Sequence, residues 1–436
     1  MEPFSLPTDR TALVSRLTSS GMPPHAEMMP GTPPLTGDAA NDAWRQAASG
    51  SGRRMLYLHV PFCRSRCSFC GFYVHATTDE SVEAYTELVL RELGQPDARE
   101  WLTKDPIEVV YFGGGTPTDL SANGLRRVIS FIREHFNISA DVEFTVEGRL
   151  FGFDDEKVAA CMDAGATRFS FGVQAFETEL RRSLGRRLAR EELIERIIRI
   201  KQICGDRVAV IADLIYGLPG QTQADWLEEI RTVHEDAPLD GVDLYRLKML
   251  PGIPLHARME KEKAWTEEEL LARHAEACEF LGGKGWNRLS VTHWGRNKLE
   301  RNRYNHWAKT GADILPYGCG AGGGIGDWVF MQMSDLDDYR KQVEAGNKPL
   351  GVAMKRQPMA RLRMPIIDQM ERGFWDPKTF PDVDFTPLLE NWTVAGVWRA
   401  DDANIYRLTP LGEFYQTRLS AMLTGFCFSH FSAGML

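Results

Sequence analysis

The chain has 436 residues and a formal net charge of −9, since 51 Lys and Arg face 60 Asp and Glu. Hydrophobic residues make up 43% and charged residues 25%, fractions that exclude a mostly disordered chain. The acidic balance argues against a general nucleic-acid binder, which needs basic surface to neutralise phosphates. The length suffices for one large core with a smaller domain, or for two or three domains.

No stretch approaches the roughly 18 apolar residues of a membrane helix. Met1–Pro34 carries scattered charges and lacks the apolar segment of a signal peptide. The sequence therefore predicts a cytoplasmic protein with no membrane or nucleic-acid partner. In that compartment eight cysteines are expected to be reduced, metal-binding or catalytic rather than paired.

Residues 1–50 are expected to form an extension over the surface, because they are rich in Pro, Gly, Ser and Met. From residue 55 the pattern alternates strands with helices. The predicted strands are Met55–Val60, Ile107–Phe112, Val142–Glu147, Arg168–Val173, Val208–Ile215 and Gly241–Leu250. The predicted helices are Glu80–Leu93, Leu125–His135, Asp155–Ala164, Arg190–Cys204, Asp225–Asp236 and Thr266–Leu281.

Repeated strand–helix units predict an α/β fold with a parallel sheet and crossover helices. A full eight-unit barrel usually needs about 250 residues, so residues 51–290 are expected to form a partial, six-unit (β/α)6 TIM-like barrel. Residues 291–352 hold a Gly cluster and are expected to be a connecting region that closes the active site. Residues 353–436 are expected to form a mainly helical C-terminal domain.

The most informative segment is the loop after the first strand, which carries Cys63, Cys67 and Cys70. Loops at the carboxyl ends of parallel strands are where such sheets place active sites. Three thiolates on one loop can bind a soft metal centre. A [4Fe–4S] cluster usually takes four Cys ligands, so three would leave one iron open. The alternative is a structural zinc site completed by His59 or His75, which lacks the distant second ligand pair that zinc sites use.

This loop resembles that of radical S-adenosylmethionine (SAM) enzymes, which read Cys-x3-Cys-x-Phe-Cys after the first barrel strand. The segments HVPFC, FGGGTPT, FGVQAF and DLIYGLPGQT are similar to the coproporphyrinogen dehydrogenase-like branch, which acts on or around heme. The resemblance covers roughly residues 50–430. It implies that Cys63, Cys67 and Cys70 ligate a [4Fe–4S] cluster and that SAM chelates the open iron. One electron from the cluster then cleaves a carbon–sulfur bond of SAM.

Three groups of this branch differ just after the last cysteine. Coproporphyrinogen III dehydrogenases carry a further Cys where this chain has Phe72, and the heme chaperones usually have Asp at Gly71. The anaerobic heme-degradation methyltransferases read Cys-Gly-Phe-Phe/Tyr, which is similar to Cys70–Tyr73, and share the Gly-Ala-Gly-Gly run at Gly320–Gly323. The resemblance therefore favours the third group.

That group implies an enzyme that transfers a SAM-derived methyl group to heme and opens the macrocycle without oxygen. Iron and a linear tetrapyrrole would be released. A flavodoxin-like electron donor is implied, together with a downstream tetrapyrrole reductase or heme-delivery protein. Two alternatives stay open, namely an oxygen-independent coproporphyrinogen III decarboxylase and a non-catalytic heme chaperone.

The resemblance also implies a set of SAM contacts. They are Tyr57, Phe69, Gly114, Gly115, Thr116, Glu147, Gln174, Arg186, Asp213, Lys248 and Gly322. Glu147 ends a strand and is expected to face the barrel mouth, while Glu143 has the same parity. Asp213 interrupts an apolar strand, where a buried carboxylate is costly unless paired. Lys248 and Gly322 depart from the family pattern, so binding of a second SAM stays open.

A heme substrate needs apolar walls, cations for its propionates and a ligand for its iron. The candidates are Arg246, Lys248, His293, Arg301, Arg303, His306 and Trp307. Among the other cysteines, Cys161, Cys204 and Cys278 lie on predicted helices and are expected in the core. Cys319 lies in the Gly cluster and is a candidate to face the substrate.

Overall fold

The computed structural model describes residues 13, 17, 33–48, 52–71, 75–95, 105–248, 253–259, 265–356 and 359–430. Within these residues one twelve-stranded sheet has the order β14-β13-β12-β11-β1-β4-β5-β6-β7-β8-β10-β9. Its centre consists of six parallel strands, as predicted. They are β1 (Arg54–Val60), β4 (Ile107–Gly114), β5 (Ile138–Gly148), β6 (Arg168–Gln174), β7 (Ala209–Tyr216) and β8 (Gly241–Arg246). The partial (β/α)6 barrel is confirmed.

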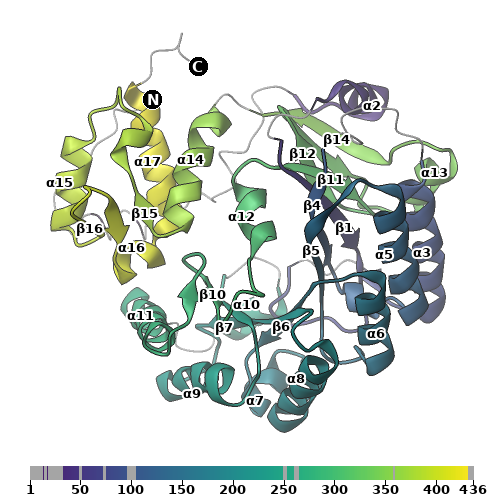
Figure 1. The fold of residues 1–436 in the computed structure, drawn as a ribbon, viewed down its shortest axis with the longest axis horizontal. Coiled ribbons are helices and arrows are strands. Elements are labelled where there is room, and N and C mark those ends of the chain that lie inside the picture. Colours follow the sequence, from purple (N-terminus) through teal and green to yellow (C-terminus); the bar gives the residue numbers. More distant parts are fainter. Residues whose placement is uncertain are drawn as a thin grey trace.

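The crossover helices lie along the outer side of this curved sheet (Figure 1). They are α3 (Asp79–Leu93), α5 (Ala122–His135), α6 (Asp155–Ala164), α8 (Arg190–Cys204), α9 (Gln223–Glu235) and α11 (Glu267–Gly283). Shorter elements of the same region are β2 (Phe62–Cys63), β3 (His75–Ala76), the 3₁₀ turn η2 (Pro117–Asp119), α7 (Thr178–Ser183) and α10 (Pro254–Met259). Thr78 begins α3 and Thr266 begins α11, each through a capping box.

Two segments contain more regular structure than the sequence suggested. Residues 291–352 were expected only as a connection, yet they add β10 (His293–Gly295), α12 (Arg303–Lys309), β11 (Asp313–Tyr317), β12 (Gly322–Ile325), β13 (Trp328–Gln332) and α13 (Leu336–Glu344). β11 pairs in parallel with β1, and the strands beyond it are antiparallel. β9 (Asn287–Arg288) forms the opposite edge, and β14 (Leu350–Lys355) runs across the expected boundary at residue 352.

The expected N-terminal extension also contains a helix, α2 (Gly37–Gln46). Trp44 is buried, and its ring meets that of Phe330 on β13 edge to face, with centroids 5.0 Å apart. Leu35 pairs with Ala353 of β14. This part of the extension therefore belongs to the main core.

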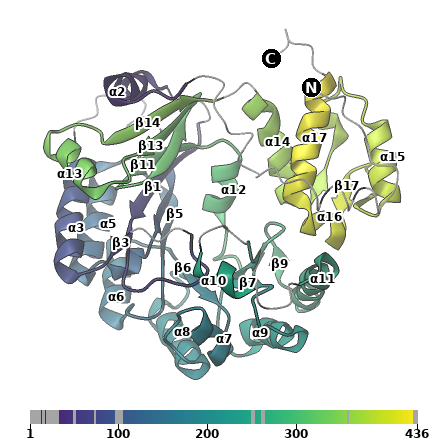
Figure 2. The ribbon, with the colours of Figure 1, turned by 180° about the vertical axis from the view of Figure 1, so that it is seen from behind.

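The C-terminal segment is mainly helical, with α14 (Met359–Glu371), α15 (Thr386–Val394), α16 (Pro410–Phe414) and α17 (Gln416–His430). It also holds the turn η3 (Pro377–Thr379) and a small antiparallel sheet of β15 (Phe374–Trp375), β16 (Trp398–Ala400) and β17 (Tyr406–Leu408). Its own core includes Trp375, Trp392 and Trp398. Helix α12 lies between this segment and the barrel (Figure 2). No helix among the described residues has the length and apolar character that crossing a membrane requires.

Candidate functional site

The cysteine loop lies at the carboxyl end of β1. Cys63 and Cys67 are buried, with 4% and 1% of their surface exposed, and Cys70 is partly exposed. The Thr116 hydroxyl donates to the Cys63 sulfur at 3.2 Å, and the Cys70 amide donates to the Cys67 carbonyl at 3.3 Å. The predicted Cys-Gly-Phe-Tyr motif continues into residues 72 and 73, which lie outside the described residues.

The glycine-rich turn after β4 packs directly against this loop. A Cβ atom at Gly115 would lie 2.5 Å from the Phe62 carbonyl oxygen, so a side chain there would collide with backbone. Gly114 has a φ of +108°, which other residues rarely adopt, and a Cβ would lie 2.6 Å from the His59 ring. The turn therefore brings bare backbone and the Thr116 hydroxyl beside the cysteines.

A partly buried cation, Arg186, acts on the same thiols. Burial lowers the pKa of Arg186, while the Cys67, Cys70 and Cys63 thiols oppose this shift. Its Nε is buried without a hydrogen-bond partner among the described residues. Its guanidinium lies 5.5 Å from the centre of the Phe69 ring. An orphaned donor beside three thiols fits an anionic group, such as a thiolate-ligated cluster or a carboxylate.

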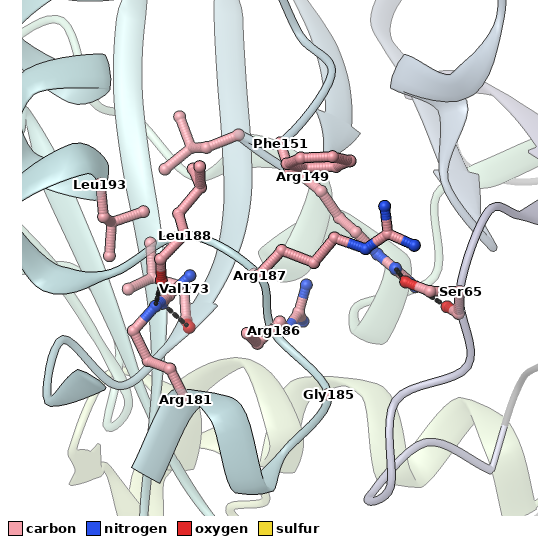
Figure 3. Close-up of a pocket in the computed structure, with 12 residues that line it drawn as sticks. Ser65, Arg149, Phe151, Val173, Arg181, Gly185, Arg186, Arg187, Leu188 and Leu193 are labelled. Atoms are coloured by element: carbon pink, nitrogen blue, oxygen red, sulfur yellow. Dashed lines mark hydrogen bonds between the residues drawn. The ribbon is translucent and has the colours of Figure 1, made fainter. Parts of the chain in front are cut away.

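A basic pocket opens next to the cysteine loop (Figure 3). It is narrow, with a cavity volume of about 20 Å³, and Arg149, Arg186, Arg187 and Phe151 contribute to its lining. Arg149 donates to both the hydroxyl and the carbonyl oxygen of Ser65, each at 2.7 Å. The pocket therefore joins the cysteine loop to an exposed cationic rim.

Glu147 ends β5 among three tyrosines. The Tyr111 hydroxyl donates to its Oε2 at 3.1 Å, and burial raises the pKa of Glu147 to about 7. The rings of Tyr111 and Tyr304 stack with centroids 3.8 Å apart, and Tyr57 stacks next to both at 6.0 to 6.3 Å. Glu147 can therefore hold or release a proton near neutral pH inside the barrel.

Glu143 plays a different part from Glu147. It is buried, and its two carboxylate oxygens accept from the backbone amides of Arg303 and Tyr304 at 3.0 and 3.1 Å. These are the first amides of α12, which has no side-chain cap of its own. Glu143 therefore anchors α12 to the barrel.

Asp213 lies on β7 and is partly buried, with Ser170 Oγ 3.5 Å from its Oδ1. Burial, the neighbouring Asp243 and Glu147 all raise the pKa of Asp213 well above its usual value. The ionised form of Asp213 is therefore disfavoured in the folded protein. Gln174 ends β6 with a φ of 71°, in the left-handed region.

The expected SAM contacts are not all adjacent. Gly114, Gly115, Thr116, Glu147 and Gln174 lie at or just beyond the carboxyl ends of β4, β5 and β6, while Tyr57 and Asp213 lie within β1 and β7. Lys248 is exposed just after β8. Gly322 lies on β12, which β11 separates from β1, and Met331 Sδ would lie 2.9 Å from a Cβ there.

Most of the heme-contact candidates form ion pairs within the protein. His293 is fully buried, with Asp243 Oδ2 2.6 Å from its Nδ1 and Glu300 Oε1 3.0 Å from its Nε2. Both ring nitrogens thus lie against carboxylate oxygens inside the barrel, so His293 is an ion-pair partner in this structure. The other pairs are Arg246 with Glu267, Arg301 and Arg303 with Asp141, and His306 with Asp368.

Trp307 packs with Met55 and Val109, near the amino ends of β1 and β4 and away from the cysteine loop. Cys319 was a candidate to face the substrate. Cys319 is fully buried, and its thiol donates to the Ser334 carbonyl at 3.4 Å. Cys161 and Cys204 are core residues as expected, and Cys278 is partly buried.

A second group of potential metal ligands lies outside the barrel. His274, Cys278 and Glu413 bring their donor atoms within 4.8 Å of one another. Arg288 pairs with the same Glu413. Burial lowers the pKa of His274, but Cys278 and Glu413 raise it to about 9, so the imidazole is cationic. The group therefore acts as a salt-bridge network between α11 and α16.

Sequence reasoning missed several residues of the barrel interior. Arg149 follows directly after β5, which ends at Gly148, and it could have been found from that position. Asp243 alternates with apolar residues in the strand GVDLYR, a weak signal. Arg168 and Glu300, which form a buried ion pair at 2.9 Å, gave no signal because they lie 132 positions apart.

Comparisons with known proteins agree with this geometry. Residues 57–233 match the family model described as the Radical SAM superfamily. The chain is 36% identical to anaerobilin synthase from Escherichia coli O157:H7 over 409 residues, covering 90% of this chain and 89% of that protein. It is 26% identical to a heme chaperone from Lactococcus lactis, covering 65% and 73% of the two chains.

It is also 28% identical to an oxygen-independent coproporphyrinogen III oxidase from Helicobacter pylori, covering 72% and 71%. Among solved structures, coproporphyrinogen III oxidase from Escherichia coli superposes with a TM-score of 0.75 at 23% identity. That superposition covers 89% of this chain and 94% of the other. It establishes the shared fold.

Proposed function

Because the chain belongs to the radical SAM superfamily, we propose that it is an anaerobic enzyme that degrades heme. As a superfamily member it uses a [4Fe–4S] cluster and SAM. The observation that carries the substrate is the 36% identity to anaerobilin synthase across 90% of the chain. The heme chaperone and the coproporphyrinogen oxidase share less of the chain and less identity.

In this proposal Cys63, Cys67 and Cys70 hold the cluster. When bound, the cluster supplies the electron that cleaves a carbon–sulfur bond of SAM and yields a carbon radical. Gly114 and Gly115 let SAM approach the backbone, since no Cβ occupies that space. Arg186, with its orphaned Nε, provides a cation for the SAM carboxylate. Glu147 accepts hydrogen bonds from the ribose or the amino group.

We further propose that the enzyme transfers a SAM-derived methyl group to heme and opens the macrocycle. Iron and a linear tetrapyrrole are the products. The motif Cys70-Gly71-Phe72-Tyr73 and the Gly320–Gly323 run support this choice over the decarboxylases and chaperones of the same branch. Lys248, exposed at the end of β8, is the remaining candidate cation for a propionate.

The electron comes from a flavodoxin-like donor, and the linear product passes to a reductase or a similar partner. The basic rim of Arg149 and Arg187 beside the cysteine loop supports approach of an acidic donor. All eight cysteines are free, which supports the reducing cytoplasm as the compartment.

The test is an anaerobic incubation of the cluster-loaded protein with SAM, heme and a reductant, followed by absorbance and product mass. Loss of the heme band with an iron-free, ring-opened product is expected, and Cys67→Ala should abolish it. Intact heme that stays bound would point to the chaperone. Loss of carboxyl groups from a porphyrinogen, with heme untouched, would point to the decarboxylase.

A further inference from the structure

Two carboxyl groups lie side by side inside the barrel. Asp213 of β7 and Asp243 of β8 are register partners in parallel strands, so they lie level on one face. Adjacent strands are about 4.8 Å apart, which places these side chains within reach of each other. Asp243 is 2% exposed, and its Oδ1 is buried with no hydrogen-bond partner among the described residues. An orphaned carboxylate oxygen in such a place needs a donor.

The other oxygen of Asp243 is already engaged. Its Oδ2 lies 2.6 Å from His293 Nδ1. The other ring nitrogen of His293, Nε2, lies 3.0 Å from Glu300 Oε1. Glu300 in turn forms an ion pair with Arg168 at 2.9 Å. Burial lowers the pKa of His293, but the two carboxylates raise it to about 9. His293 is therefore an imidazolium beside Asp243, whose Oδ1 is left without a donor among the described residues.

We propose that Asp213 carries a proton, donates it as a hydrogen bond to Asp243 Oδ1, and serves as the acid that protonates the tetrapyrrole. This inference rests on the proposed heme-degrading function. The charged and titratable groups that act on Asp213 are Glu147, Arg168, Asp243 and His293, together with the phenols of Tyr111 and Tyr245. Tyr245, two residues beyond Asp243 and on the same face, is 38% exposed, so solvent reaches this part of the barrel.

The proton balance of iron release calls for such an acid. Two of the four pyrrole nitrogens bind iron as anions, so two Fe–N bonds to anionic nitrogens break and two N–H bonds form. The electron pairs stay on nitrogen, and the iron keeps its oxidation state. Asp213 supplies one proton and becomes a carboxylate, which His293 helps to stabilise through Asp243. Solvent then reprotonates Asp213 for the second transfer.

The proton can be observed before any turnover, by infrared spectroscopy of the cluster-loaded protein without SAM or heme. At pH 8.5 the Glu147 and Glu229 protons are mostly lost, because burial raises the pKa of each only to about 7. The carboxylic C=O band of Asp213 should persist there and vanish in Asp213→Asn. Asp163→Asn, an exposed control on α6, should leave the band unchanged. The same band in Asp213→Asn as in wild type would overturn the proposal.

Kinetics of Asp243→Asn then test the role of the pair, because this residue is not an expected SAM contact. SAM cleavage should stay within about twofold of wild type, while iron release slows by about a hundredfold, the range of general-acid effects. Equal slowing of both steps, or normal iron release, would overturn the proposal. If wild-type protein leaves heme intact, the proposed function fails. The infrared band still shows whether Asp213 carries a proton, because that measurement needs neither SAM nor heme.

Discussion

At the scale of single residues, two kinds of feature distinguish the site. One is a glycine where a side chain would collide with backbone, and the other is a charged group with a nitrogen that has no hydrogen-bond partner among the described residues. Gly115 and the orphaned Nε of Arg186 are two such features, and both lie beside the cysteine loop. The cysteines and the glycine turn could be predicted from sequence because their signal is local. The chain of ion pairs that runs from Asp243 through His293 and Glu300 to Arg168 could not be predicted from sequence. It joins segments whose pairing the hydrophobic pattern of the sequence does not reveal.

The first residue-scale prediction concerns Gly115→Ala. The new Cβ would lie 2.5 Å from the Phe62 carbonyl oxygen, so the turn must move away from β2. We expect a loss of about 1–3 kcal/mol in the free energy of unfolding and weaker SAM binding. Denaturant unfolding and calorimetric SAM titration measure the two effects.

Gly283→Ala is the matched control, since nothing lies within 4 Å of a Cβ at that helical position. Alanine there should be neutral or stabilising by up to about 1 kcal/mol. Full SAM affinity in Gly115→Ala would show that the close approach of the turn is not needed.

The second residue-scale prediction concerns the pH dependence of stability. The pKa of His293 is about 9 in the folded state, against about 6.5 in an unfolded chain. A raised histidine pKa stabilises fully below about pH 6.5, and the contribution is lost as pH rises through 9. Wild type should therefore lose more stability between pH 6 and 9.5 than His293→Asn does.

Denaturant midpoints at the two pH values measure this difference. His135→Asn, which alters an exposed histidine at the end of α5, should keep the wild-type pH dependence. Equal pH dependence in wild type and His293→Asn would mean that the imidazolium does not stabilise the barrel.

At the scale of elements, α12 closes the amino end of the barrel and brings Tyr304 against Tyr111. The strands up to β8 could be predicted because each is a compact apolar run followed by its own helix. The strands from β11 to β14 were missed because they are short or Gly-rich and pair over long separations, as Arg54 does with Asp313. Local patterns carry little information about such pairs.

The element-scale prediction concerns the anchor of α12. Glu143→Ala leaves the amides of Arg303 and Tyr304 without their acceptor, so we expect a loss of about 2–3 kcal/mol in the free energy of unfolding. Glu143→Gln keeps one acceptor oxygen and should lose less. Urea unfolding measures both, with the exposed Glu134→Ala on α5 as control. A stability equal to that of the control would contradict the anchoring role.

At the scale of the whole molecule, one sheet spans the chain from β1 to β14, and the C-terminal segment packs its own core beside it. His306 and Lys309 of α12 pair with Asp368 and Glu371 of α14, each at 2.9 Å, and so join the two cores. The cysteine loop and the glycine turn lie at the carboxyl ends of the parallel strands. The carboxyl groups of Glu147, Asp213 and Asp243 lie on β5, β7 and β8 of the same sheet. This arrangement is what directs SAM chemistry onto heme in the proposed function.

The most direct measurement uses SAM with a deuterated methyl group, heme and a reductant under strict exclusion of oxygen, with mass analysis of every tetrapyrrole formed. The account predicts an iron-free, ring-opened product that carries the labelled methyl group in wild type and no such product in Cys67→Ala. An unlabelled tetrapyrrole, or a closed ring that has lost carboxyl groups, would contradict it.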